Sequence, residues 1–297
     1  LLPAGHADST FQRIDTHGNA CPILPHSCSH KRRVGHRRRA NAQALYAAVG
    51  SGTQKVEQEL FDLFPKAKVL RMDADTVGAS RGHEALLREF EEKNIPILLG
   101  TQMVAKGLDF ENVTLVGVLS ADISLYVDNY RAAERTFSLL TQVVGRAGRG
   151  GKTGRAVIQT YTPGNDVIRC AARQDYDAFY ESEIRMRRLR RYPPFADLFT
   201  VTISGTEEGR VLRAAVSVRE TLRQLCRRPE LAAGEPEVLG PAPAPVVKVN
   251  NRFRYRCTLV GKNDKATREM LAWLQKDFAK DSANRGMNLF VDHNAAD

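Results

Sequence analysis

The residues with the clearest chemical potential are two arginines in the stretch Gln142-Val-Val-Gly-Arg146-Ala-Gly-Arg149. They lie three positions apart at the end of an expected helix, so they point the same way. Planar guanidinium groups suit bidentate contacts with phosphate oxygens. In phosphoryl transfer, an arginine near the γ-phosphate accelerates the reaction by roughly 10³–10⁵. The pattern predicts a phosphate site with Arg146 and Arg149 as candidate catalytic residues. Two solvated arginines are the alternative.

The Gly151-Lys152-Thr153 tripeptide just beyond resembles the end of a Walker A phosphate loop. Such a loop needs a glycine five positions before its second glycine, and that position is Arg146. A Walker A loop also follows a strand and opens a helix, whereas here a helical pattern comes first and a strand pattern follows. We therefore expect these glycines to make a helix-to-strand turn, where glycine supplies positive φ.

A second polar segment, residues 100–122, follows a short apolar run typical of a buried parallel strand. Ligands of open α/β sheets bind beyond the carboxyl ends of such strands. Thr101 and Gln102 can hydrogen-bond phosphate or sugar, and Gly107 permits a close backbone approach. Asp109 can accept from a ribose hydroxyl or a neighbouring arginine. A polar loop without a ligand is the alternative that the segment alone leaves open.

Composition limits the classes of partner. The 297 residues carry a formal net charge of +10, which suits a polyanion such as nucleic acid or an acidic protein tail. An ordinary basic soluble protein is the other interpretation. No apolar run is long enough for a transmembrane helix, and the N-terminal residues lack the order of a signal peptide. We expect a cytoplasmic protein with no membrane partner. The five scattered cysteines do not form a disulfide framework.

Strand and helix patterns alternate through the first part of the chain. Helical spacing marks residues 53–64, 82–94 and 131–144, and short apolar runs mark strands at 69–72, 95–101, 113–122 and 155–161. Alternating strands and helices predict an α/β layer with a parallel sheet.

A basic run and a Pro-Pro pair at residues 185–198 separate this part from a second domain. Beyond them we expect two βαβ units forming a small two-layer ferredoxin-like sandwich, with a Pro-rich link at 235–249 that carries a short strand near 236–239. On the strand at 252–261, alternation places Arg252, Arg254 and Arg256 on one face. That face could bind DNA or an acidic peptide, or could simply be a polar outer face.

Four smaller candidates are interpreted as structural residues. Cys170, Cys226 and Cys257 lie in apolar segments and are expected to be core thiols. Trp273 has helical spacing with two leucines, which favours a core or half-core position over base stacking.

The sequences of these motifs resemble those of one family. "GTQMVAKGLDFENVTLVGVLSAD" followed by "RAAERTFSLLTQVVGRAGRG" resembles motifs V and VI of superfamily 2 helicases, as written in the PriA family, the primosomal protein N′ of bacterial replication restart. "VGSGTQKVEQELFDLFPKAKVLRMDADT", "RRYPPF" and "VLGPAPAP" are also similar. The resemblance implies a RecA-like helicase lobe 2 with a parallel sheet at residues 45–190, followed by a small α+β ferredoxin-like C-terminal domain at 191–297.

The resemblance also implies roles for individual residues. Thr101, Gln102 and Lys106 would contact the phosphates of single-stranded DNA. The residues expected to bind ATP are Gly107, Asp109, Gln142, Arg146 and Arg149. Family members use ATP and Mg²⁺ to unwind DNA in the 3′ to 5′ direction at forked or single-stranded substrates. Their partners include single-strand-binding protein and primosome proteins.

The sequence departs from the family in its nucleotide-binding motifs. It contains no Walker A motif and no Asp-Glu-x-His box for Mg²⁺. We therefore expect a C-terminal part of an ATP-dependent helicase that does not hydrolyse ATP alone. The alternative is a non-catalytic DNA- or partner-binding module left by truncation.

Residues 1–44 differ from the zinc-binding insert that the family places there. They offer Cys21 and Cys28, with His17, His26, His30 and His36, but no Cys-x-x-Cys pair. Zinc is expected for the family, yet we predict no metal site here. We expect a degenerate or disordered segment, explained by a reading-frame error or a decayed gene upstream of about Ala42.

Overall fold

The computed structural model describes residues 12–14, 20–21, 43–48, 52–73, 82–101, 112–148, 154–232 and 234–295. The chain divides into two compact units by its internal contacts. Unit 1 comprises Leu1–Val127 and Arg131–Glu183, and unit 2 comprises Asp128–Tyr130 and Ile184–Asp297.

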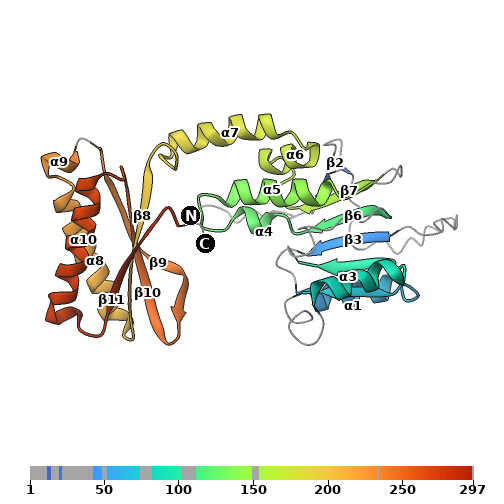
Figure 1. The fold of residues 1–297 in the computed structure, drawn as a ribbon, viewed down its shortest axis with the longest axis horizontal. Coiled ribbons are helices and arrows are strands. Elements are labelled where there is room, and N and C mark those ends of the chain that lie inside the picture. The colour runs from blue at the N-terminus through green and yellow to red at the C-terminus, as the bar shows by residue number, and fades with distance from the viewer. Residues whose placement is uncertain are drawn as a thin grey trace, which may run out of the picture. The chain divides into compact units, whose positions relative to one another are not determined.

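Unit 1 is built on a sheet with the strand order β2-β1-β7-β6-β3-β5-β4 (Figure 1). Its strands are β1 (Gln12–Ile14), β2 (Ala20–Cys21), β3 (Gln43–Ala48), β4 (Val69–Met72), β5 (Ile97–Gly100), β6 (Val113–Leu119) and β7 (Arg155–Thr160). Its helices are α1 (Thr53–Leu63), α3 (His83–Glu92), α4 (Asp122–Leu125), α5 (Ala132–Val144) and α6 (Asp166–Arg173). Strands β3 to β7 pair in parallel, and β1 joins β7 antiparallel.

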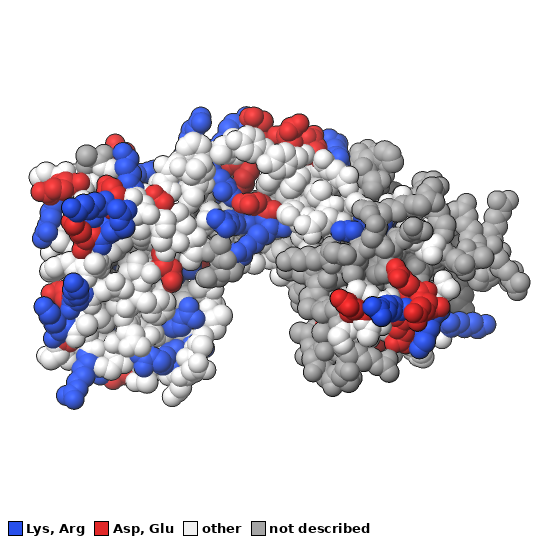
Figure 2. All heavy atoms as spheres, in the orientation of Figure 1, with Lys and Arg blue, Asp and Glu red and all other residues white. Residues whose placement is uncertain are grey.

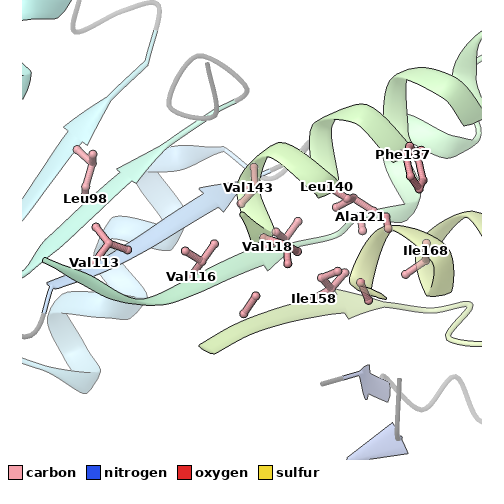
Figure 3. Close-up of a cluster of buried hydrophobic side chains, with 14 of the residues drawn as sticks. Leu98, Val113, Val116, Val118, Ala121, Phe137, Leu140, Val143, Ile158 and Ile168 are labelled. Atoms are coloured by element: carbon pink, nitrogen blue, oxygen red, sulfur yellow. The ribbon is translucent and has the colours of Figure 1, made fainter. Parts of the chain in front are cut away.

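Both faces of this parallel sheet are covered. All four residues of β5 are buried, and alternation along the strand places Ile97 and Leu99 on one face and Leu98 on the other. Leu98 belongs to the larger cluster, which also contains residues of α3, α5 and α6, whereas Ile97 and Leu99 pack with α1. Figure 3 shows Phe137, Leu140 and Val143 of α5 in the larger cluster. In a sheet that is buried on both faces, polar residues are found mainly at the ends of the strands.

Unit 2 is a two-layer sandwich. Its antiparallel sheet has the order β11-β8-β10-β9, with β8 (Asp197–Gly205), β9 (Glu237–Val249), β10 (Arg252–Gly261) and β11 (Asn288–His293). Its other elements are α8 (Glu208–Leu225), α9 (Pro229–Ala232), α10 (Lys265–Lys280) and the 3₁₀ helix Ser282–Asn284, while α7 (Tyr176–Leu189) crosses the boundary between the units. Helices α8 and α10 cover one face of the sheet (Figure 1).

The predicted fold class is confirmed: an α/β unit with a parallel sheet precedes a small ferredoxin-like α+β unit. Seven residues in the segment expected to be degenerate or disordered belong to strands: 12–14 form β1, 20–21 form β2, and Gln43 and Ala44 begin β3. The metal-ligand candidates Cys28, His17, His26, His30 and His36 lie outside the described residues.

Two details of unit 2 differ from expectation. The Pro-rich link is largely strand, because β9 continues from Glu237 to Val249. Proline lacks an N–H donor, and β9 tolerates three prolines because it is an edge strand. Of the two positions predicted for Trp273, core or half-core, the full core position is wrong, because the residue is 46% exposed while Leu271 and Leu274 are buried.

The predicted core position is confirmed for two of the three cysteines for which it was expected. Cys226 and Cys257 are buried, and burial raises the pKa of both thiols, to about 11 for Cys257. Cys170 is only half-buried and packs against the core cluster of unit 1. None of the described helices combines the length and the apolar character needed to span a membrane.

Candidate functional site

Three polar residues lie at the carboxyl edge of the parallel sheet, by which we mean the side on which its strands end; the side on which they begin is the amino edge. Thr101 follows β5 directly and is half-buried. Asp73 follows β4, and Thr53 opens the helix that comes after β3. Because β3, β4 and β5 are parallel neighbours, all three lie at the edge where ligands of such sheets bind. The predicted position of Thr101 at a strand end is therefore confirmed.

A buried polar network orders this edge. The Thr53 hydroxyl donates to Asp73 Oδ2 at 2.5 Å. Arg71 lies between two carboxylates, with Nε 3.2 Å from Asp73 Oδ2 and Nη1 3.2 Å from Glu57 Oε2. These contacts tie the start of α1 to the end of β4. Sequence reasoning missed the network, because Thr53 and Asp73 are 20 positions apart and no spacing rule links them.

Asp122, which follows β6, orders the same carboxyl edge at the strand beside β3. Its residue is only 6% exposed, and its carboxylate accepts from the Thr160 hydroxyl at 2.7 Å, the Thr162 hydroxyl at 2.7 Å and the Tyr161 backbone N–H at 2.9 Å. Burial alone would raise the pKa of Asp122, but these hydrogen bonds to the charged form outweigh burial and lower it. The carboxylate thus joins the end of β6 to the end of β7.

Two further predicted residues, Gln142 and Arg146, lie at the C-terminal end of α5, near the amino edge of the sheet. Just beyond its C-terminus, the Gly148 N–H donates to the carbonyl of Val113, the first residue of β6, at 3.1 Å. Gln142 is exposed, with its amide 3.3 Å from the Ser138 hydroxyl. Arg146 is half-buried in the turn after the helix. Gln142 and Arg146 therefore lie towards the amino edge, and Thr101 lies at the carboxyl edge.

The remaining predicted site residues, Gln102, Lys106, Gly107, Asp109 and Arg149, lie outside the described residues. The ends of their segments are nevertheless located. Residues 102–111 connect Thr101 at the carboxyl end of β5 to Asn112, which precedes β6 at the amino edge. One segment therefore joins the two edges.

The helix-to-strand order around the Gly-Lys-Thr tripeptide is confirmed, with α5 before it and β7 after it. Gly148 has a φ of 81°, the left-handed conformation expected of a turn glycine.

The donor set at the amino edge fits a phosphate group better than a metal. A guanidinium and a carboxamide offer donors to phosphate oxygens. Among the described residues, no group of three or more histidine, cysteine or carboxylate side chains could hold a metal ion.

Comparisons with known proteins match both units. The model of the helicase conserved C-terminal domain matches residues 41–151, and that of the primosomal protein N C-terminal domain matches residues 188–294. The replication restart protein PriA of Bacillus subtilis is 40% identical over 91% of this chain, and that of Synechocystis is 38% identical over 86%. The chain spans 33% and 30% of the lengths of these two relatives.

Proposed function

Because the chain belongs to the PriA family and corresponds to the C-terminal part of its members, we propose that it is the second motor lobe and terminal domain of an ATP-dependent 3′ to 5′ DNA helicase of replication restart. Its partners are then forked or single-stranded DNA, single-strand-binding protein and primosome proteins, in the cytoplasm.

In this proposal, DNA binds at the carboxyl edge of the sheet in unit 1. Thr101, Gln102 and Lys106 contact the phosphates of one strand, and such contacts supply most of the affinity for single-stranded nucleic acid. The position of Thr101 supports this assignment, because Thr101 directly follows β5, whose four residues are all buried, and is itself half-buried. The Thr53–Asp73 network beside it keeps the neighbouring strand ends in place.

ATP is assigned to the opposite edge. Gln142, Arg146 and Arg149 face the phosphates, and Gly107 and Asp109 belong to the same site. ATP with Mg²⁺ supplies the phosphoryl group whose transfer drives the motor. The guanidinium groups of Arg146 and Arg149 offer fixed positive charge to the phosphate oxygens. The sequence holds no Walker A motif, so we expect no ATP hydrolysis by this chain alone.

The observation that carries the proposal is the separation of the two sets of residues. Thr101 and Arg146 lie at opposite edges of one sheet, and residues 102–111 join them. A segment with DNA contacts at one end and ATP contacts at the other would link strand binding to the nucleotide state.

The test is salt-dependent binding of forked DNA by wild type and by a Thr101→Ala/Lys106→Ala double variant. We expect weaker binding at every salt concentration and a fall of about one in the slope of log affinity against log salt, because one phosphate contact by a cation is lost. Lys66→Ala is the matched control, since Lys66 is exposed and lies just before β4, at the amino edge. Equal affinities and slopes for the double variant and the control would contradict the proposal.

A further inference from the structure

The first half of α7 displays two aromatic side chains on the surface of unit 1. Tyr176 is 60% exposed and Tyr180 is 48% exposed. Because they are four positions apart, about one helical turn, they are neighbours on the helix surface. Their ring centroids are 6.2 Å apart and their planes differ by 27°, so the two rings stack. Apolar residues scattered singly over a surface are ordinary, whereas two adjoining rings form a continuous surface of the kind found at interaction sites.

A buried aromatic pair holds these tyrosines in place. Phe179 of α7 is buried and stacks on Phe137 of α5, with ring centroids 4.1 Å apart and planes 7° from parallel. The Tyr176 ring lies 6.2 Å from the same Phe137 ring. At the start of α7, the Asp175 carboxylate accepts from the Ala178 backbone N–H at 3.0 Å. The tyrosines therefore lie on an anchored helix, so little conformational freedom is lost when a partner binds them.

Carboxylates flank the two rings on the same helix. Residues 174–184 contain four acidic residues and no lysine or arginine, although the whole chain has a net charge of +10. Asp177 and Glu181 each follow a tyrosine directly, so both lie on the same side of the ring pair, and both are exposed. Figure 2 shows acidic side chains over α7, at the top of the view. We call the four residues Tyr176, Asp177, Tyr180 and Glu181 the tyrosine patch.

We propose that the tyrosine patch binds a basic segment of a partner protein, with arginine or lysine side chains lying over the rings and pairing with the two carboxylates. A cation is attracted to the face of a tyrosine ring. Guanidinium groups also stack on aromatic faces and pair with carboxylates, so arginine fits both parts of the patch. The patch includes none of the residues assigned to DNA or ATP, and the inference does not rest on the proposed function.

The charge of the patch disfavours other occupants. A DNA strand or an acidic peptide would bring negative charge against carboxylates, and like charges repel most strongly at short range. A purely apolar partner would remove water from Asp177 and Glu181 without replacing it. The positive charge of the chain as a whole repels basic partners elsewhere, which directs them to this acidic stretch. The basic run at residues 185–191 of a second copy is the competing occupant, and the experiment separates it from a different protein.

The experiment measures binding of fluorescent nona-arginine to the full 297-residue chain at low salt. Tyr180→Leu keeps an apolar side chain but removes the ring, and it should weaken affinity about threefold. Tyr180→Phe keeps the face of the ring and should bind like the wild type. Tyr126→Leu is the matched control, since it replaces an exposed tyrosine of unit 1 outside α7.

A second pair of variants tests the charge. Asp177→Asn/Glu181→Gln should weaken binding about fivefold at low salt and by less as salt is raised, because exposed ion pairs are screened. Glu91→Gln/Glu92→Gln is the matched control, since it removes two exposed carboxylates from α3 in the same unit and should leave the affinity unchanged.

Several outcomes would overturn the inference. Equal affinities of Tyr180→Leu and Tyr126→Leu, or a Tyr180→Phe affinity as low as that of Tyr180→Leu, would show that the ring does not contact the cation. Equal affinities of the two carboxylate variants would reduce the binding to general electrostatic attraction. Sedimentation as a dimer by the wild type but not by Tyr180→Leu would assign the patch to a second copy. A weaker affinity of Tyr180→Leu than of Tyr126→Leu for fluorescent oligothymidine would assign it to nucleic acid.

Discussion

The two units use their sheets in opposite ways. In unit 1 the sheet is parallel and helices pack on both faces, so candidate ligand-binding residues are confined to its edges. In unit 2 the sheet is antiparallel and its helices cover one face, so three arginines can lie on the other. Residues beyond the strand ends of unit 1 lie outside the ladder of the sheet, whereas the residues of β10 are held in register by β8 and β9. Candidate contact residues therefore lie at strand ends in unit 1 and on a sheet face in unit 2.

The largest expected effect concerns Arg146. In a chimaera that joins this chain to the first motor lobe of the Bacillus subtilis relative, Arg146→Ala should lower kcat for DNA-stimulated ATP hydrolysis by roughly 10³–10⁵, because it removes the charge that we propose to face the transferred phosphoryl group. Steady-state phosphate release measures it. Arg213→Ala in unit 2 is the control and should leave kcat unchanged. A kcat for Arg146→Ala within a few-fold of the parent would show that this edge does not serve the chemistry.

Next in size are core truncations that test whether each sheet carries its own core. Leu140 belongs to the cluster of unit 1 and Leu222 to that of unit 2, and both are almost fully buried. Leu140→Ala and Leu222→Ala should each lower the free energy of unfolding by about 2–5 kcal/mol. Hydrogen exchange should show lost protection only in the unit that carries the substitution. Equal loss in both units after either substitution would mean that the cores are not independent.

A smaller effect is expected for Asp122, whose carboxylate supports the structure of unit 1. Asp122→Asn should lower the free energy of unfolding at neutral pH by about 1–3 kcal/mol, since three hydrogen bonds to a buried charge are weakened. The folded pKa of Asp122 is lowered, so the unfolded state binds the proton more readily. Its contribution is therefore complete above the unfolded pKa of about 3.9 and disappears as pH falls through the folded value.

Urea denaturation of wild type and Asp122→Asn across this acidic range measures the contribution. The difference between the two proteins should shrink as the solution is acidified. A difference that stays constant down to the lowest pH at which both proteins fold would contradict the assigned role of the charge.

The smallest effect is expected for Asp128, the acidic partner of Arg256 in unit 2. Asp128→Asn should change the free energy of unfolding by no more than about 1 kcal/mol, because the Asp128 side chain is 74% exposed. Thermal unfolding at low salt, where charge effects are greatest, provides the check. A large loss of stability would mean that the Arg256–Asp128 pair helps to hold unit 2 together.

Regular elements with clear periodicity could be predicted from the sequence, and one central strand could not. Strand β4 has the predicted bounds 69–72, and α5 starts one residue after its predicted start. Strand β3, with the sequence Gln-Ala-Leu-Tyr-Ala-Ala, gives no strand signal because alanine is depleted in strands. It is specified instead by its parallel pairing with β5 on one side and β6 on the other, which are tertiary contacts.

The candidate sites could likewise be predicted only in part from the sequence. Thr101 could be placed at a strand end because a buried apolar run precedes it. The separation of Thr101 from Arg146 required the direction of α5 relative to β6, given by the Gly148–Val113 hydrogen bond. The alternation of Arg254 and Arg256 was visible in the sequence. That the buried Arg254 Nε has no hydrogen-bond partner among the described residues was not visible, because it depends on the neighbours across two strands, Ser204 and Asn288.

The two buried thiols of unit 2 have a practical consequence. Peroxides and alkylating reagents attack the thiolate, and a pKa of about 11 for Cys257 leaves almost none of that form at physiological pH. Cys226 shares the raised pKa and the burial. Unit 2 should therefore withstand oxidative stress without forming sulfenic acid or mixed disulfides at these positions, and labelling with a maleimide should require prior denaturation.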